Sequence, residues 1–360
     1  MTYIGAEVII SPLGRTTAEN WAAVSANQSG ISLVKQAGFD NADLYLSKML
    51  DLVDDYKFER LLSDALTAVS EQIDPKILTS RRTIVIISST KGELDKDIND
   101  PFGKSIAALV SAFALVNQPI VLSNACISGV LAINAASNFI QASIYDHAIV
   151  IGCDLISDFV VYGFQSLFAI SNKPCAPFDA SRNGITLGEG CGAVVVSNTK
   201  EIFKNGALQL LPGTSANDAN HISGPSRTGE GLFRSVKKTL ESNQVAPEEI
   251  DFICAHGTAT VFNDEMESIA FDRVGLTNVP LSSLKGYFGH TLGAAGVIET
   301  AATMQMMRHG TLLKSLGYQE SGTSKALNVL SENVAGQPET ILKTASGFGG
   351  GNASLIIRSL

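Results

Sequence analysis

The sequence predicts an α/β protein, and three features of the chain support that prediction. Short runs rich in β-branched residues alternate with alanine-rich stretches of helical length. The apolar runs are nearly continuous, as expected of strands that are covered on both faces of a sheet. The composition is typical of a compact folded protein, with 45% hydrophobic residues, 17% charged residues and 32 glycines among 360 residues.

The expected elements follow one another along the chain. The first strand is expected in MTYIGAEVIISPLGR, and further strands are expected at 82–90, 118–125, 147–154, 192–198, 250–257, 279–285, 340–346 and 352–359. Helices are expected at 106–116, 127–142 and 292–309. The last helix is expected to end at Gly310, because glycine adopts the left-handed conformation of a helix C-cap at no steric cost.

The chain is expected to divide into two halves, 1–205 and 206–360. A polar, glycine-rich stretch at 199–231 separates two sets of predicted strands. Each half also ends in the same way, with a glycine-rich turn followed by an apolar run: LGEG before CGAVVVSN, and GFGGG before NASLIIRS. This similarity indicates a structural duplication.

Charge and cysteine content exclude several classes of protein. The formal net charge of −9 and the lack of a basic stripe argue against a nucleic-acid partner, although an acidic protein partner would need only a local basic patch. The five cysteines are irregularly spaced without a CxxC pair, which indicates neither a disulfide framework nor a zinc ribbon. The N-terminus has no basic start and contains Glu7 and Pro12, and the apolar run 106–116 is too short to span a bilayer. A cytoplasmic protein without a membrane span is expected.

Cys126 is the first candidate for chemistry. It lies in VLSNACISGV, where a predicted strand passes into a predicted helix. Unpaired N–H groups and the dipole at a helix N-terminus favour an anion, so the thiolate is expected to be stabilised there. Taken alone, a cysteine such as Cys126 is more often one that packs in the core.

Two histidines are candidates for partners of this cysteine. His256 ends the strand in CAHGTAT, and Thr258 and Thr260 follow it with hydroxyl groups that suit an amide-bearing ligand or cap a loop. His290 lies between a glycine turn and an Ala/Gly-rich helix in SSLKGYFGHTLGAAGVIE. Lys285 is expected to end the preceding strand, and Glu299 in the helix to neutralise it. Taken alone, either histidine could also have a purely structural role.

Two loops complete the set of candidates. SGFGGGNAS places Phe348 among glycines, and its backbone N–H groups suit a developing oxyanion or form a plain turn before the last strand. PFDASRNGITLGEG contains Asp179, Arg182 and Glu189, which are expected to form a structural ion-pair loop.

Five blocks occur in a fixed order between about residue 120 and the C-terminus: NACISG, PFDASRNGITLGEG, CAHGTAT, SSLKGYFGHTLGAAGVIE and SGFGGGNAS. With these blocks the chain resembles the elongating β-ketoacyl-acyl-carrier-protein synthases of the thiolase-like superfamily. The block from Lys285 to Gly296 is the most specific of the five. The resemblance implies a thiolase-like fold, in which two similar halves form a layered αβαβα sandwich. Residues 1–205 would carry the nucleophile and 206–360 the two histidines.

The resemblance implies a role for each reacting residue. Cys126 matches the nucleophile that accepts an acyl group. His256 and His290 match the histidines that bind the malonyl thioester carbonyl and assist decarboxylation. Lys285 matches the lysine that orders this pair electrostatically, and Glu299 matches its acidic neighbour.

The resemblance also assigns the residues that receive the substrate. Thr258 and Thr260 match the threonines that line a phosphopantetheine tunnel. Phe348 matches a gating phenylalanine whose backbone N–H joins that of Cys126 in an oxyanion hole.

The implied reaction is a decarboxylative Claisen condensation in fatty acid, polyketide or aryl-polyene synthesis. An acyl group on Cys126 would be extended by malonyl-acyl carrier protein to give a 3-oxoacyl-acyl carrier protein. No metal and no redox cofactor are expected, because the substrates are carried on the phosphopantetheine of acyl carrier protein. The other expected partner is a second subunit, in a homodimer or a ketosynthase-like heterodimer.

Three departures from the family pattern are expected to matter. The chain is shorter than typical elongating synthases, and the shortening lies before Cys126. Ser346 stands where an aromatic residue is common, and Gly351 replaces a usual threonine. These departures favour a specialised polyketide or aryl-polyene pathway.

Other members of the superfamily fit the chain less well. A thiolase would need a second cysteine in the loop that here contains Phe348. Initiating ketosynthases have an asparagine in place of His290. The non-enzymatic alternative is a catalytically silent subunit that resembles a chain-length factor, but such subunits typically lose the nucleophile.

Overall fold

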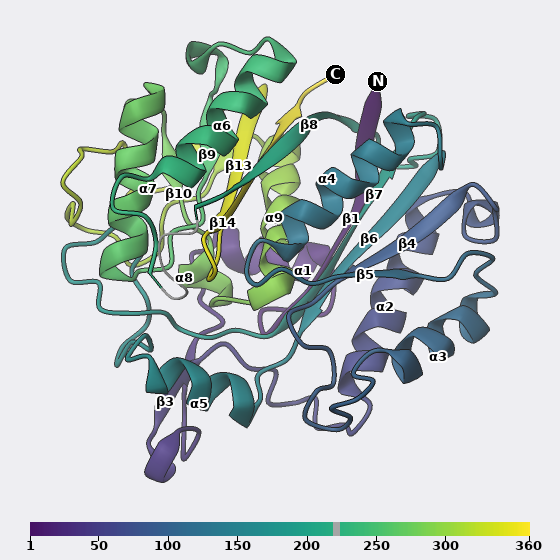
Figure 1. Ribbon diagram of the computed structural model, residues 1–360, viewed down its shortest axis with the longest axis horizontal. Coiled ribbons are helices and arrows are strands. Elements are labelled where there is room, and N and C mark those ends of the chain that lie inside the picture. Colours follow the sequence, from purple (N-terminus) through teal and green to yellow (C-terminus); the bar gives the residue numbers. More distant parts are fainter. Residues whose placement is uncertain (219–223) are drawn as a thin grey trace.

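The computed structural model describes residues 1–218 and 224–360, which are built around one mixed ten-stranded sheet (Figure 1). The N-terminal half supplies β1 (Thr2–Ile10), β4 (Thr83–Ser88), β5 (Ile120–Leu122), β6 (His147–Asp154) and β7 (Gly190–Ser197). The C-terminal half supplies β8 (Leu208–Asn217), β9 (Phe252–Cys254), β10 (Leu281–Ser282), β13 (Thr340–Ser346) and β14 (Gly351–Arg358). The strand order is β10-β9-β13-β14-β8-β1-β7-β6-β4-β5.

The two halves of the sheet repeat one topology. From the centre outward, β1 pairs with β7 and β7 with β6 in antiparallel fashion, and β6 pairs with β4 and β4 with β5 in parallel. In the other half, β8, β14, β13, β9 and β10 follow the same sequence of antiparallel and parallel pairings. The halves join where Thr2–Ile4 of β1 pairs with Leu208–Leu210 of β8. The predicted architecture of two similar halves is confirmed.

Helices cover the sheet in three layers. The helices α4 (Ser128–Gln141) and α9 (Ala295–His309) contact each other and lie in the middle, between the two halves of the sheet. The helices α2 (Lys57–Gln72) and α3 (Gly103–Phe113) cover the outer face of the N-terminal half, and α6 (Glu230–Asn243) and α7 (Val261–Val274) cover that of the C-terminal half. The result is an αβαβα sandwich.

Smaller elements complete the fold at its edges. They are α1 (Thr17–Ser25), α5 (Asp158–Ser166), α8 (Lys285–Phe288) and two ribbons, β2 (Ser32–Val34) with β3 (Leu44–Leu46) and β11 (Thr311–Leu312) with β12 (Val334–Ala335). Within the described ranges, every helix is too short or too polar to cross a bilayer.

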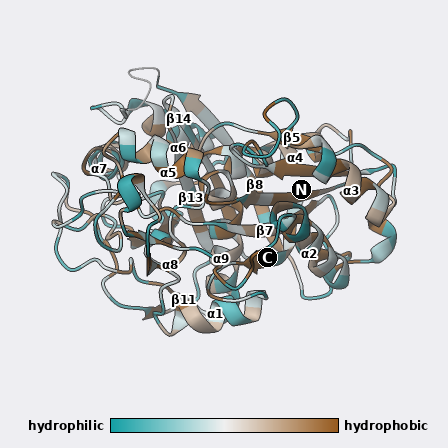
Figure 2. Ribbon diagram, turned by 90° about the horizontal axis from the view of Figure 1, so that it is seen from below, coloured by the Kyte–Doolittle hydropathy of each residue, from teal (hydrophilic) through white to brown (hydrophobic). Residues whose placement is uncertain are grey.

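Burial on both faces explains why the strands are continuously apolar. In β4, Ile84 and Ile86 belong to the central core with α4 and α9, whereas Val85 and Ile87 face the outer core with α2. Successive side chains of a strand point to opposite faces, so both sets must be apolar. Figure 2 shows hydrophobic colouring along the strands and polar colouring on the outer turns.

Several element boundaries were predicted well and others were wrong. The structure places β6 and β13 at the predicted limits, 147–154 and 340–346, and Gly310 caps α9 with φ 60°. The stretch 199–231 was expected to be a polar connection, but it contains β8, which lies in the middle of the sheet. The buried residues Leu208 and Leu210 hold β8 there. Part of this stretch, 219–223, lies outside the described residues.

Lys285 was expected to end a strand, and this prediction is wrong. The strand β10 ends at Ser282, and Lys285 begins the short helix α8. A strand ending at Lys285 would alternate its side chains across the sheet, whereas the helical turn directs the lysine toward the histidines described below.

Candidate active site

Cys126 lies in the tight turn between β5 and α4. Ala125 before it has φ 45°, a left-handed conformation that is uncommon for residues other than glycine. The Ser128 hydroxyl holds the turn, since it accepts a hydrogen bond from the Asn124 N–H at 2.7 Å and donates one to the Ala125 carbonyl at 2.6 Å. Strain of this kind persists only where surrounding contacts enforce it, and here it presents the Cys126 side chain beside the start of α4.

His256 is positioned from behind by a carboxylate of α7. It follows β9, and the backbone N–H groups of His256 and Gly257 donate to Glu267 at 3.0 and 2.6 Å. Glu267 is completely buried, and burial raises its pKa to about 7. The loop that carries His256 is therefore anchored to α7 through backbone hydrogen bonds.

His290 is held between the two halves of the molecule. Its backbone N–H donates to the Thr186 carbonyl at 2.7 Å, and its carbonyl accepts from Gly188 at 2.9 Å. Beyond it, the Gly293 N–H donates to Asp154 at the end of β6, at 2.7 Å. The backbone around His290 is thus held by contacts with segments that precede it in the sequence.

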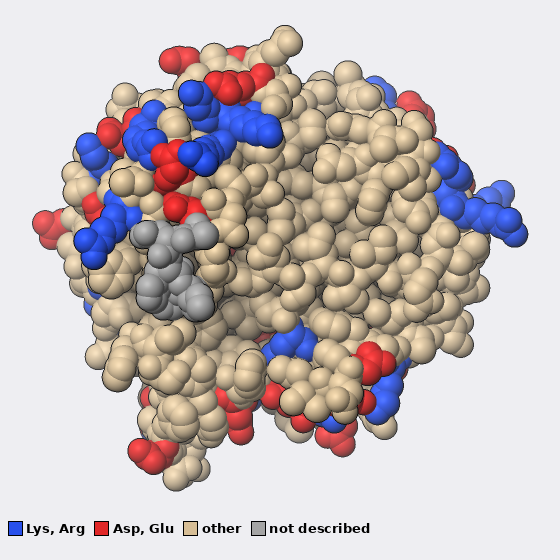
Figure 3. Space-filling view, viewed as in Figure 1, with Lys and Arg blue, Asp and Glu red and all other residues tan. Residues whose placement is uncertain are grey.

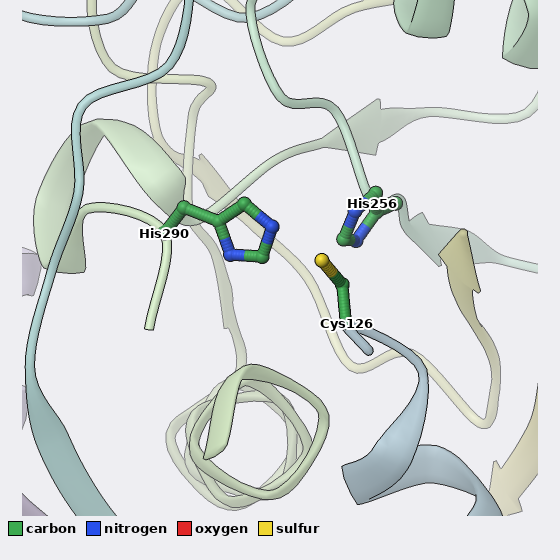
Figure 4. Close-up of side chains that lie close together, drawn as sticks. All are labelled: Cys126, His256 and His290. Carbon is green, nitrogen blue, oxygen red and sulfur yellow. The ribbon is translucent and has the colours of Figure 1, made fainter. Parts of the chain in front are cut away.

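The structure brings Cys126, His256 and His290 together (Figure 4). The Cys126 Sγ and one ring nitrogen from each histidine lie within 4.8 Å of one another. The two imidazole centroids are 5.2 Å apart and the rings are nearly perpendicular, at 82°. This convergence of three residues from distant parts of the chain is the geometry that a shared reacting group requires.

Lys285 and Glu299 form a buried ion pair directly behind the histidines. The Lys285 ammonium lies 2.7 Å from Glu299, 2.7 Å from the His256 carbonyl oxygen and 3.2 Å from the His256 Nδ1. Both side chains are buried. The prediction that Glu299 neutralises Lys285 agrees with this contact.

The hydrogen bonds assign the same tautomer to both imidazoles. Lys285 can only donate, so the His256 Nδ1 must accept. The Leu292 backbone N–H donates to the His290 Nδ1 at 3.2 Å, so this nitrogen accepts as well. A neutral imidazole that accepts at Nδ1 carries its proton on Nε2. Each ring therefore presents an Nε2–H donor.

The surroundings keep both imidazoles neutral. Burial lowers the pKa of His256 well below its usual value, and the positive charge of Lys285 lowers it further. Burial and Lys285 do the same to the pKa of His290. Two neutral donors that face one point are suited to stabilise negative charge that develops on an oxygen.

The environment of Cys126 differs from the sequence prediction. Burial raises the pKa of its thiol to about 11, although Lys285 and a hydrogen bond from the Phe348 backbone act in the opposite direction. The prediction of a stabilised thiolate is therefore not met in the protein without substrate. Burial dominates because the Cys126 residue is only 7% exposed.

A cavity of about 400 Å³ opens onto the three residues. Its wall includes Thr258 and Thr260, whose hydroxyls are 2.9 Å apart, and Thr260 also caps the N-terminus of α7. Phe348 lies at the wall as well, 38% exposed, with its ring stacked on Phe164 at a centroid distance of 5.3 Å. The threonines and Phe348 thus lie beside Cys126 and both histidines.

Ser346 and Gly351, which depart from the family pattern, lie at or near the cavity. Ser346 lines the cavity and donates to Asn352 at 2.7 Å, so its hydroxyl is held in the wall. A Cβ at Gly351 would lie 2.8 Å from the Ile127 side chain. A larger residue at 351 would therefore need Ile127 to move.

The loop with Asp179, Arg182 and Glu189 forms structural ion pairs, as expected, and the partners lie on neighbouring helices. The Arg182 guanidinium lies 3.8 Å from Asp264 of α7, and Glu189 pairs with Lys57 of α2 at 2.5 Å. The Arg182 guanidinium also donates to the Asp179 carbonyl at 3.0 Å, so the same side chain holds the loop together and binds it to α7.

The cluster of Cys126, His256 and His290 also has the donor types of a metal site. Both Nδ1 atoms are already engaged, so only Sγ and the two Nε2 atoms remain as ligands. The buried ammonium of Lys285 beside them disfavours a divalent cation. Charge and hydrogen bonding therefore suit an oxyanion better than a metal ion.

Sequence reasoning missed three residues that shape the site: Lys343, Glu267 and Asp154. Lys343 lies 2.5 Å from Glu299 on the side away from Lys285. Its signal was a single lysine inside the apolar strand TILKTAS, where a charge must find a partner. Glu267 and Asp154 accept hydrogen bonds from backbone N–H groups of distant segments, and no local sequence pattern predicts such contacts.

Comparisons with known proteins identify the family of the chain. Residues 70–201 match the family model "Beta-ketoacyl synthase, N-terminal domain", and residues 210–319 match "Beta-ketoacyl synthase, C-terminal domain". The 3-oxoacyl-[acyl-carrier-protein] synthase 2 of Coxiella burnetii is 26% identical over 397 aligned positions, covering 97% of this chain and 96% of the relative. That of Rhizobium meliloti is 32% identical, covering 65% of this chain and 59% of the relative.

Solved structures show the same fold along the whole chain. The ketosynthase ApeO of Xenorhabdus doucetiae, in complex with its chain length factor ApeC, superposes with a TM-score of 0.86 at 26% identity, covering 100% of this chain and 98% of the other. A β-ketoacyl synthase from Burkholderia phymatum superposes with a TM-score of 0.85 at 23% identity, covering 100% and 99%. The chain therefore belongs to the β-ketoacyl synthase family, with its thiolase-like fold.

Proposed function

We propose that this chain catalyses the decarboxylative condensation of malonyl-acyl carrier protein with an acyl group held on Cys126. The observation that carries the proposal is the meeting of one thiol and two Nε2–H donors at the end of a single cavity. Relatives named 3-oxoacyl-[acyl-carrier-protein] synthase and a polyketide β-ketoacyl synthase of Streptomyces rimosus support the same reaction class.

The first step loads the acyl group. The Cys126 sulfur attacks the thioester carbonyl of the acyl carrier, and the bond between that carbonyl and the carrier sulfur breaks. The thiol proton leaves with the carrier sulfur. The thioester oxygen becomes negative during the attack, and the backbone N–H groups of Cys126 and Phe348 are the proposed donors to it.

The second step forms the carbon–carbon bond. The malonyl thioester loses carbon dioxide, and the electron pair of the broken bond forms an enolate whose oxygen accepts hydrogen bonds from the Nε2–H groups of His256 and His290. The enolate carbon attacks the acyl carbonyl on Cys126, and the sulfur leaves and takes up one proton from solvent. The product is a 3-oxoacyl thioester, and the balance needs no oxidant, reductant or metal.

Acyl carrier protein is the proposed carrier of both substrates. Thr258 and Thr260 offer adjacent hydroxyls in the cavity wall, where the amides of a phosphopantetheine arm would find partners. We expect the carrier protein to be acidic. Figure 3 shows lysines and arginines over α6 interspersed with acidic side chains, and Arg234 and Lys237 there pair with Glu230 and Glu241. We place the reaction in the cytoplasm, with a second subunit as partner.

Acylation of Cys126 tests the proposal directly. We expect mass spectrometry to find an acyl adduct on Cys126 after incubation with acyl carrier protein charged with short acyl chains, and no adduct in Cys126→Ala. Solved relatives in complex with a chain length factor raise the alternative of a silent subunit. Absence of any adduct across several chain lengths, in a folded protein, would favour that alternative.

His290→Ala separates the two steps. Its loss removes one of two donors to the enolate oxygen, so release of carbon dioxide from malonyl thioester should fall by about 10²–10³-fold. Self-acylation of Cys126 should stay measurable, because that step uses backbone donors. Undiminished release of carbon dioxide by the folded variant would refute the assigned role.

A further inference from the structure

A second buried lysine shares the carboxylate that neutralises Lys285. The Lys343 ammonium, on β13, lies 2.5 Å from one oxygen of Glu299, while Lys285 lies 2.7 Å from the other. Lys343 also donates to the Thr344 carbonyl at 2.8 Å and the Cys254 carbonyl at 3.4 Å. Both lysines are 0% exposed. Glu299 is therefore a bridge between two ammonium groups rather than half of a simple pair.

The three charges do not cancel. Two ammonium groups and one carboxylate leave one positive charge among fully buried side chains, and burial of such a charge is costly unless hydrogen bonds compensate it. Burial opposes ionisation of Glu299, yet the two lysines together hold its pKa below its usual value. The residual positive charge lies behind His256, since Lys285 contacts both the carbonyl and the Nδ1 of that residue.

Other ionisable groups face this region from every packed element. Glu267 and Asp264 of α7 lie behind the His256 loop, Asp154 of β6 lies near His290, and Cys126 and Cys254 complete the surroundings. Burial raises the pKa of each of the three carboxyls, which reduces the negative charge that they can contribute. The ammonium groups therefore dominate the field at the imidazoles.

We propose that Lys343 is a positioning residue, which acts through Glu299 and Lys285 to keep His256 neutral with its proton on Nε2. By occupying one oxygen of Glu299, Lys343 leaves the Lys285 ammonium free to donate to the His256 Nδ1, and an ammonium at that atom excludes a proton from it. The inference rests on the proposed function, because a neutral Nε2–H donor is what the enolate oxygen needs.

The pKa shifts of the two histidines have the direction that this role of Lys343 requires. Burial lowers the pKa of His256, and Lys285, His290 and Lys343 lower it further. Removal of the Lys343 charge leaves Lys285 and Glu299 as a neutral pair, so the pKa of His256 must rise. Lys285 and Lys343 also lower the pKa of His290, so that pKa should rise as well when the Lys343 charge is removed.

The test compares full-length wild type with Lys343→Met by NMR titration of the imidazoles, assigned with His256→Gln and His290→Gln. We expect His256 to take up a proton at higher pH in Lys343→Met. Its protonation equilibrium constant should increase by roughly tenfold or more. The acid limb of malonyl thioester decarboxylation should move upward with it. Lys343→Gln serves the same purpose if Lys343→Met does not fold.

Two further variants separate charge from packing. Glu299→Gln combined with Lys343→Met leaves the single charge of Lys285, so the His256 titration should return toward that of wild type. Lys57→Met removes a lysine of another buried pair, with Glu189, and should lower stability while the His256 titration stays unchanged. An unchanged His256 titration in folded Lys343→Met, or a double variant that keeps the full shift, would overturn the inference.

The two proposals fail in different ways. If wild type releases no carbon dioxide from malonyl thioester, the proposed function fails, but the imidazole titration still decides the role of Lys343. If decarboxylation proceeds and its acid limb is the same in wild type and Lys343→Met, the positioning role fails and the condensation stands.

Discussion

Cys126 lies in surroundings that oppose its own ionisation. The turn before α4 directs the sulfur into a buried space, where loss of solvent outweighs the help of Lys285 and the Phe348 backbone. The thiol therefore stays protonated near neutral pH, and attack on a thioester must be coupled to transfer of its proton. A buried, protonated thiol is protected from nonspecific oxidation and alkylation until a substrate enters.

Alkylation of Cys126 should follow its raised pKa. With a pKa of about 11, the thiolate fraction rises about tenfold for each pH unit, so labelling by iodoacetamide should accelerate steadily from pH 7 to pH 9.5. Peptide mass spectrometry at Cys126 measures the rate, with Cys126→Ala as the blank. A plateau below pH 8 would contradict the effect of burial and restore the prediction of a thiolate stabilised by the helix N-terminus.

At the scale of elements, the site depends on how closely α4 and α9 cross. A Cβ at Gly129 in α4 would lie 2.7 Å from the Val297 backbone nitrogen, and one at Gly296 in α9 would lie 2.5 Å from that of Val130. The two helices therefore touch backbone to backbone near their N-termini, close to Cys126 and to the segment after His290. Glycine at these positions sets the separation of the thiol from the imidazole.

Gly129→Ala should destabilise the protein and impair the site. The added methyl group meets backbone atoms that cannot rotate away, so the free energy of unfolding should fall by about 1–3 kcal/mol. Urea denaturation measures this, and acylation of Cys126 reports the displacement of the sulfur. Gly163→Ala in α5 is the matched control, because nothing lies within 4 Å of its Cβ. That variant should be neutral or more stable by about 0.4–1 kcal/mol, and an equal loss in both would refute the crossing argument.

At the scale of the whole molecule, one core joins the two halves. The central core combines residues of α4 and α9 with strands from both sides of the sheet. The helix α9 belongs to the C-terminal half by sequence, yet it packs on β1 and β7 of the N-terminal half. The halves repeat a topology without being independent units, and the site with its thiol from one and imidazoles from the other exists only in their union.

Neither half should fold alone. Residues 1–205 would expose the surface that α9 covers, and residues 206–360 would lose the contact of α9 with β1 and β7, so each fragment would leave much of the central core in water. We expect no cooperative urea transition by circular dichroism for either fragment, and a native-like transition when both are produced together. Cooperative unfolding of 1–205 by itself would show that the halves are separate domains.

Local patterns predicted much of the fold because strands buried on both faces have a strong signal. Continuous apolar runs placed β6 and β13 at their observed limits, and Gly310 placed the end of α9. The sequence did not predict β8, because Leu208 and Leu210 are its buried residues and the rest of the strand is half-buried or exposed. Both leucines also lie inside a polar stretch. Lys285 was assigned to a strand because a four-residue helix leaves no periodic pattern.

The sequence by itself determined the class of fold, the two-half organisation and the candidate residues for the proposed chemistry, because residue types and their order are local properties. Tertiary structure alone decided how those residues behave. It joined Lys343 to Glu299, set both imidazoles in one tautomer and buried the Cys126 thiol so deeply that its pKa rises to about 11. Charge, solvent exposure and hydrogen-bond direction at a site depend on segments that meet only when the chain has folded.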